Sequence, residues 1–122
     1  GEFVVNLMGS DRIESLQYCG STSGRHTDKL AGARLSAAPG RVVTTPLIQE
    51  AVAHLECKLV NSVTAGDHTL FIGQVVAASA EPDVFTEEDG WVSDESGRPA
   101  STLHYLGGKK YATLDRILRP QG

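Results

Sequence analysis

A single histidine at the mouth of a predicted turn, His68, is the residue best placed to do chemistry. The turn at Ala65-Gly66 separates two β-forming stretches, residues 53–59 and 67–76, and this pattern predicts a hairpin. An imidazole there can donate a hydrogen bond and stack on a flat ligand. The alternative is a structural histidine whose ring bonds the neighbouring strand, with Asp67 stabilising the turn through its own backbone.

The polar loop of residues 21–29 is a second candidate for binding. Its small, hydroxyl-bearing and cationic members include Ser23, Gly24, Arg25 and Lys29. Hydroxyl groups, cations and backbone amides gathered at a helix start are suited to binding a phosphate group. The alternative is that Thr27 or Asp28 caps the helix while the two cations are solvated.

Two aromatic residues have similar pairs of interpretations. Tyr111 follows the Gly107-Gly108 turn and is either a ligand contact or a core aromatic with its hydroxyl at the rim. Trp91 is the only tryptophan and lies in the acidic segment 81–98. It either caps the core or covers a pocket.

Several kinds of site find no support in the sequence. The four histidines and two cysteines include no pair with the spacing of metal ligands, so we expect no metal site. The strand-to-helix G-x-S-x-G motif of hydrolases is absent. The G-x-G-x-x-G and P-loop fingerprints are absent too, which argues against a Rossmann-type nucleotide site.

Composition narrows the class of protein. The chain has 122 residues, enough for one domain with its own core, of which 40% are hydrophobic and 21% charged. Its formal net charge of -4 argues against nucleic acid or an anionic membrane as a partner. No apolar run approaches the roughly 20 residues of a membrane span, and no signal peptide is recognisable. Two isolated cysteines favour a reducing compartment, so we expect a soluble cytoplasmic domain.

The expected elements are short strands and two small helices. We predict strands over residues 3–8 and 102–106 besides the hairpin, a helix capped by Asp11 and ended by Gly20, and a second helix over residues 27–33 with Leu30 facing inward. Residues 111–118 are expected to close the domain. Short strands between Gly and Pro turns predict a mostly β protein, a β-barrel with peripheral helices, and not a series of βαβ units.

Taken in order, several short segments resemble the flavin reductase-like family, and in particular its flavoredoxin and NAD(P)H:flavin oxidoreductase branch. These segments, which extend over nearly the whole chain, are Phe3-Val4-Val5-Asn6, Cys19-Gly20, Ser23-Gly24-Arg25, Asp28-Lys29-Leu30, residues 46–51, Leu55-Glu56-Cys57, Gly66-Asp67-His68, and residues 103–108 with Tyr111.

The resemblance implies a fold, a cofactor and a set of site residues. It implies a six-stranded Greek-key split barrel that forms a homodimer, with FMN near the dimer interface and NAD(P)H as the hydride donor. His68 would then be the catalytic residue, near the flavin or the nicotinamide. The residues implied to bind the cofactor are Ser23, Gly24, Arg25, Lys29, Asp67 and Tyr111.

One departure from the family pattern affects the expected function. Family members usually have several dozen residues before the Phe-Val-Val-Asn strand, whereas only Gly1 and Glu2 precede it here. We therefore expect residues 1–122 to correspond to the C-terminal two-thirds of the domain, with unpaired strand edges that pair or exchange with another chain. The alternatives to a flavin reductase are a non-catalytic split-barrel module that dimerises, or an FMN electron carrier reduced by a protein partner.

Overall fold

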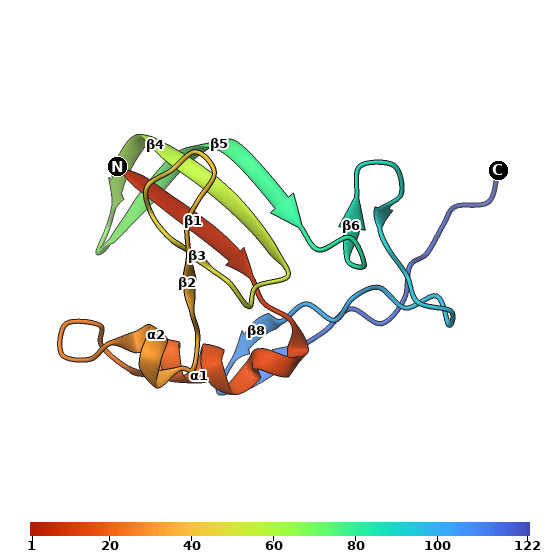
Figure 1. The fold of residues 1–122 in the computed structure, drawn as a ribbon, viewed down its shortest axis with the longest axis horizontal. Helices are drawn as coiled ribbons and strands as arrows, with labels where there is room; N and C mark the ends of the chain where they lie inside the picture. The colour runs from red at the N-terminus through yellow and green to blue at the C-terminus, as the bar shows by residue number, and fades with distance from the viewer.

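The computed structural model describes residues 1–122 and is built mainly from antiparallel β-strands (Figure 1). A three-stranded sheet has the order β1-β4-β5. Its strands are β1 (Glu2–Leu7), β4 (Ala53–Ala65) and β5 (His68–Ala80). Three smaller two-stranded sheets pair β2 (Ala37–Ala38) with β3 (Leu47–Ile48), β6 (Phe85–Thr86) with β7 (Gly90–Trp91), and β8 (His104–Gly107) with β9 (Lys110–Ala112).

The predicted hairpin is confirmed and is longer than expected. Strands β4 and β5 contain 13 residues each, and Ala65 pairs with His68 across the turn. Gly66 has a φ of 63°, a left-handed conformation that favours glycine and makes so short a turn possible. The distal half of the hairpin extends beyond the end of β1, so apolar side chains such as Phe71, 61% exposed, face solvent there.

The pairing of β4 with β5 shifts between Glu56 and Cys57, where Val76 of β5 is skipped, whereas β4 pairs with β1 there without a break. Glu56 and Cys57 therefore lie on opposite faces of the sheet, and both are buried, at 1% and 3% exposure, because both faces are covered at this point. A second shift skips Val60 in β4 and corresponds to the approximate alternation in the sequence.

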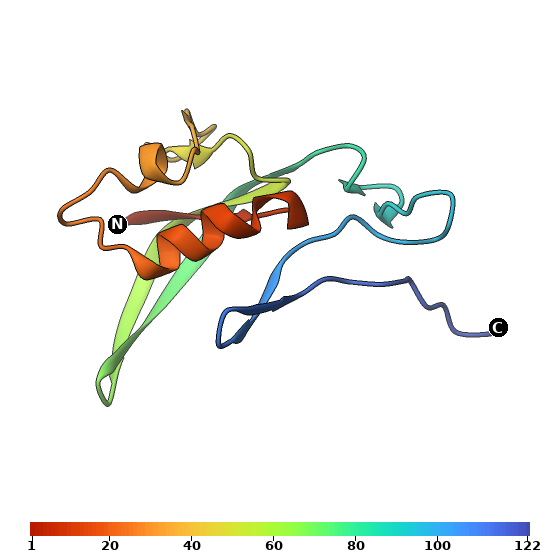
Figure 2. The same ribbon diagram turned by 90° about the horizontal axis from the view of Figure 1, so that it is seen from below.

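Two short helices lie against each other after the end of β1 (Figures 1 and 2). The 3-10 turn η1 (Ser10–Arg12) leads into α1 (Ile13–Ser21), and α2 (Lys29–Gly32) follows a loop. The expected Asp11 cap is wrong, because that residue lies inside η1 and no side chain caps either start. Gly20 lies within α1, which ends one residue later, where the Ser21 hydroxyl donates to Gln17 O at 2.8 Å.

The second helix is shorter than the predicted range of residues 27–33. Asp28 is extended, at φ -71° and ψ 98°, and its carboxylate accepts a hydrogen bond from Ala31 N at 3.2 Å. Arg34 adopts a φ of 57°, which is incompatible with a continued helix. Leu30 packs inward as predicted, against a core cluster formed by Met8, Ala33, Leu35 and Ala51.

The C-terminal segment differs most from expectation. Strand β8 was predicted as an inner strand, but it pairs only with β9, and Tyr105 and Leu106 are each 65% exposed. The residues before it join the rest of the fold through a bridge between Thr102 and Gly9 and the bond from Leu103 N to Met8 O at 3.0 Å, and its partner β9 reaches α1 through the Tyr111 side chain. Residues 113–122 form no helix or strand and do not close the domain, because no strand lies beside them to share backbone hydrogen bonds.

Trp91 covers a pocket, the second of its two interpretations: it lines a cavity with Phe85, whose ring it meets edge to face with centroids 5.7 Å apart. None of the helices has the length and hydropathy required to cross a membrane.

Candidate functional site

The C-terminal half of α1 brings together two of the site residues predicted from the sequence. Lys29, at the start of α2, reaches back so that its Nζ donates to Cys19 O at 2.8 Å. The last carbonyl groups of a helix lack intrahelical partners, and a cation is favourable there because of the helix dipole. The Lys29 amine therefore ties α2 to the end of α1.

Tyr111 reaches the same part of α1 from β9. Its hydroxyl donates to Gln17 Oε1 at 3.1 Å. Tyr105 lies opposite Tyr111 in the β8–β9 hairpin, and the two rings are 5.3 Å apart between centroids with a tilt of 50°. Both tyrosines line a pocket of about 260 Å³ with Leu16, Gln17 and Gly20.

The sequence did not identify Gln17 or Tyr105 as a candidate site residue. A signal for Tyr105 was present: two tyrosines flank the Gly107-Gly108 turn, and hairpin pairing brings such residues face to face. No sequence pattern singled out Gln17, because the contact joins residues 94 positions apart.

The loop between the two helices is held by its own polar groups. Ser23 Oγ accepts a hydrogen bond from Arg25 N at 3.3 Å. Of the two residues proposed as the helix cap, Thr27 and Asp28, it is Asp28 that caps α2. Arg25 is exposed and its guanidinium forms no ion pair. A Cβ added at Gly24 would lie 3.6 Å from Lys29 Cδ, so this glycine is next to the Lys29 side chain. Of the two cations, Arg25 is thus the one available to an anionic ligand.

His68 and Asp67 occupy the tip of the β4–β5 hairpin. The imidazole Nδ1 lies 2.6 Å from Asp67 Oδ1, and the two side chains are 84% and 94% exposed. Because the carboxylate engages Nδ1, Nε2 is left free to meet a ligand. The structural alternative, a bond from the ring to the neighbouring strand, is not found.

The structure does not bring these two residues to the end of α1. Figures 1 and 2 both show the β4–β5 turn apart from the loop that joins α1 to α2. Within one copy of the chain, the predicted catalytic and cofactor-binding residues therefore form two separate groups.

Glu56 is a buried carboxylate that sequence reasoning did not identify as special. Its Oε1 accepts hydrogen bonds from Val42 N at 2.9 Å and Val43 N at 3.1 Å, while its buried Oε2 has no partner. The bond from Val42 does most to hold the pKa of Glu56 below its usual value of 4.5, although burial acts in the opposite direction. The carboxylate fixes the loop before β3 against β4.

Comparison with known proteins adds to this geometry. The model of the family described as "Flavin reductase like domain" matches residues 1–113. An uncharacterised protein of Pyrococcus abyssi is 30% identical over 124 residues, which cover 98% of this chain and 66% of that protein. The flavin reductase (NADH) of Kitasatospora aureofaciens is 34% identical over 86 residues, which cover 69% of this chain and 42% of that protein.

A solved structure is also similar to this chain. The FMN-binding protein from Thermus thermophilus, with bound 1-cyclohex-2-enone, superposes with a TM-score of 0.76 and 28% identity, covering 98% of this chain and 62% of that one. The mostly β split-barrel fold predicted from the sequence is confirmed by this likeness. The chain spans between 42% and 66% of the lengths of these three proteins. The match over residues 1–113 shows that the chain belongs to the flavin reductase-like family.

Proposed function

We infer that this chain is an FMN-binding oxidoreductase domain in which NAD(P)H reduces the flavin and electrons pass to an acceptor. The observation that carries this inference is the pair of tyrosines, Tyr105 and Tyr111, beside the C-terminal half of α1 in a member of this family. The free cysteines Cys19 and Cys57 suit a reducing cytoplasm as its compartment.

The groups at this end of α1 match the parts of FMN. Tyr105 is 65% exposed and offers an aromatic face to a flat ring system. The exposed guanidinium of Arg25 suits a phosphate group, and the Ser23 hydroxyl, which accepts from the Arg25 backbone amide, lies in the same loop. Lys29 donates to Cys19 O and so holds both the loop and the end of α1 in place, on which contacts with the phosphate and with the ring system depend. When bound, FMN supplies the redox chemistry, taking a hydride from NAD(P)H and passing electrons on.

His68 has the role of a hydrogen-bond donor or proton carrier toward the ring system or the nicotinamide. Asp67 orients the imidazole through Nδ1, which directs Nε2 outward to the ligand. Because the hairpin tip lies apart from α1 in one chain, we assign His68 to the site of a second copy.

A homodimer would provide that second copy. Strand β5 is an edge of the three-stranded sheet, so one side of its backbone has no partner strand. This edge includes the exposed apolar residues Leu70, Phe71 and Ile72. Unpaired apolar edges associate with other strands, which supports pairing or exchange between two copies. A strictly monomeric mass in light scattering at micromolar concentration would refute this part of the proposal.

The separation of His68 from α1 also favours a second candidate function. If no dimer brings the two groups together, the chain would bind FMN as an electron carrier reduced by a protein partner, or act as a non-catalytic module. NADH and NADPH oxidation in the presence of FMN separates the reductase from both alternatives.

The test of the first candidate is a flavin titration. Saturable quenching of flavin fluorescence is expected with FMN, with weaker binding of riboflavin, which lacks the phosphate. FAD serves as a third ligand, since its phosphates are shared with a second nucleotide. His68→Ala is expected to keep FMN affinity and slow NAD(P)H oxidation. An unchanged rate in that variant would remove the catalytic role of His68, and failure to bind any flavin would remove the proposed function.

A further inference from the structure

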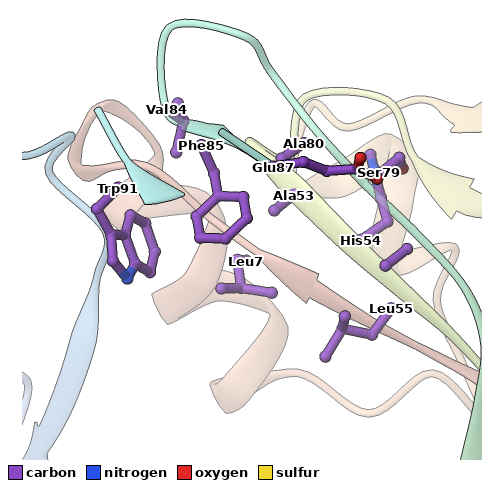
Figure 3. A pocket seen from close by; sticks show the side chains of 11 residues that line it. Leu7, Ala53, His54, Leu55, Ser79, Ala80, Val84, Phe85, Glu87 and Trp91 are labelled. Atoms are coloured by element: carbon purple, nitrogen blue, oxygen red, sulfur yellow. Dashed lines mark hydrogen bonds between the residues drawn. The ribbon is translucent and has the colours of Figure 1, made fainter. Parts of the chain in front are cut away.

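One cavity of the chain lies beside the start of β4 and the end of β5 (Figure 3). In Figure 1 these strand ends lie away from α2 and the loop before it. The cavity has a volume of about 510 Å³, within the range of pockets that hold small molecules. Leu7 and Leu55 lie on its sheet side, and Phe85 and Trp91 close it from the segment that follows β5. We call it the aromatic cavity.

The aromatic rings in its walls are only partly buried by the rest of the protein. The rings of Phe85 and Trp91 meet edge to face, yet these residues remain 42% and 40% exposed. Small alanine side chains at the ends of β4 and β5 leave the space open in front of them. A flat ligand entering the aromatic cavity would therefore bury apolar area against both rings.

Among the polar side chains that line the aromatic cavity, only one forms no hydrogen bond or ion pair within the protein. The ring of His54 is engaged on both sides: Nε2 donates to Ile48 O at 2.7 Å, and Nδ1 lies 3.4 Å from Ser79 Oγ. Because a carbonyl oxygen only accepts, Nε2 carries a proton. The Glu87 carboxylate, in contrast, takes part in no hydrogen bond or ion pair, and in Figure 3 it extends toward Ser79 and His54.

The charge around the opening defines the ligand further. The lining contains no lysine or arginine, and the segment that forms the mouth has acidic side chains at residues 81, 83, 87, 88 and 89. Phosphate-bearing molecules such as FMN and NAD(P)H are disfavoured by such a rim. A cation is favoured both by the carboxylates and by the faces of the two aromatic rings.

We propose that the aromatic cavity is a second ligand site, separate from the flavin-binding residues, and that it takes a planar aromatic cation. The ring lies against Phe85 and Trp91, and its positive charge faces Glu87. This site does not depend on the proposed flavin chemistry, because none of the residues at the end of α1 contributes to it.

Titration of the intact chain with 1-methylquinolinium, a two-ring cation, tests the proposal. The matched anion is 1-naphthoate, which has two fused rings of similar size. Calorimetry gives the affinities, and the emission of Trp91, the only tryptophan, reports binding at the aromatic cavity. We expect saturable binding of the cation, much weaker binding of the anion, and a decrease in cation affinity as salt is added.

Variants then locate the site. Glu87→Gln is expected to weaken the cation by about two- to fivefold, whereas Glu88→Gln, which removes the same charge from a neighbour outside the lining, leaves the affinity within about twofold. Phe85→Leu is expected to weaken it by roughly two- to fivefold, with circular dichroism as the check on folding. Addition of FMN should leave the cation affinity unchanged.

Three results would overturn the proposal: no saturable binding of the cation, equal binding of the anion, or equal effects of the two glutamate variants. Displacement of the cation by FMN would show that the two sites are one. A chain that binds the cation but no flavin would keep this proposal and remove the flavin function, so the two inferences fail separately.

Discussion

Replacing Lys29 with methionine removes one hydrogen bond and one charge from the C-terminus of α1 while keeping most of the side-chain length. The bond that is lost runs from Nζ to Cys19 O at 2.8 Å. Hydrogen bonds of charged groups contribute about 1.5–3 kcal/mol, and a cation at a helix C-terminus adds about 0.3–1 kcal/mol. Since Lys29 is only half-buried, water compensates in part, and we expect the free energy of unfolding to fall by about 1–2 kcal/mol.

Urea unfolding followed by far-UV circular dichroism measures this difference. The matched control is Arg25→Met in the same loop, where the lost side chain is exposed and forms no ion pair. We expect that variant to stay within about 0.5 kcal/mol of the original chain.

The same two variants separate support of the loop from contact with the ligand. Arg25→Met should lower FMN affinity by roughly fivefold and leave riboflavin affinity unchanged, because only FMN has the phosphate. Lys29→Met should weaken both flavins alike, through the loop. An unchanged stability of Lys29→Met, or a selective loss of FMN in that variant alone, would refute the assignment of Lys29 as a support and Arg25 as the anion contact.

Three further predictions concern other parts of the fold. Because the folded-state pKa of Glu56 is lowered, mainly by the backbone amide of residue 42, its contribution to stability is complete above pH 4.5 and is lost as the pH falls through the lowered value. Urea unfolding from pH 7 to pH 3 should therefore show a steeper loss for the original chain than for Glu56→Gln, and equal slopes would contradict this. Gly73→Ala should lower the free energy of unfolding by about 1–3 kcal/mol, because the new Cβ would overlap the Phe3 ring. Gly20→Ala should raise it by about 0.5–1 kcal/mol, because a Cβ there would meet no atom within 4 Å. Thermal unfolding of the two variants measures the difference. His68→Ala should leave the unfolding free energy within about 0.5 kcal/mol, because the side chain is 84% exposed, and a larger loss would indicate that the tip is packed.

Local sequence patterns predicted the elements whose contacts are local. The β4–β5 hairpin follows from its β-forming stretches and from glycine at position 66, and the Asp28 cap follows from residue type next to a helix start. Burial of Glu56 was not predictable, because it depends on the loop of residues 42 and 43, more than ten positions earlier in the chain, whose amides cover its carboxylate.

The candidate site was predictable in its residue types but not in its assembly. The resemblance singled out Tyr111 and Lys29. The partner of Tyr111 is Gln17, which lies 94 positions away in the sequence. Lys29 donates to Cys19 O at the end of the preceding helix, and residue types alone do not predict that contact. The exposure of β8 depends on which strands lie beside it, and no pattern within residues 102–106 specifies that.

The central claim is that flavin binds at the end of α1, against Tyr105 and Tyr111. Chemical-shift mapping by NMR during an FMN titration tests this most directly. We expect the largest shifts at Gln17, Arg25 and Tyr111, with little change at Trp91 in the aromatic cavity. Shifts concentrated at Trp91 and its neighbours, or none that saturate, would contradict the account.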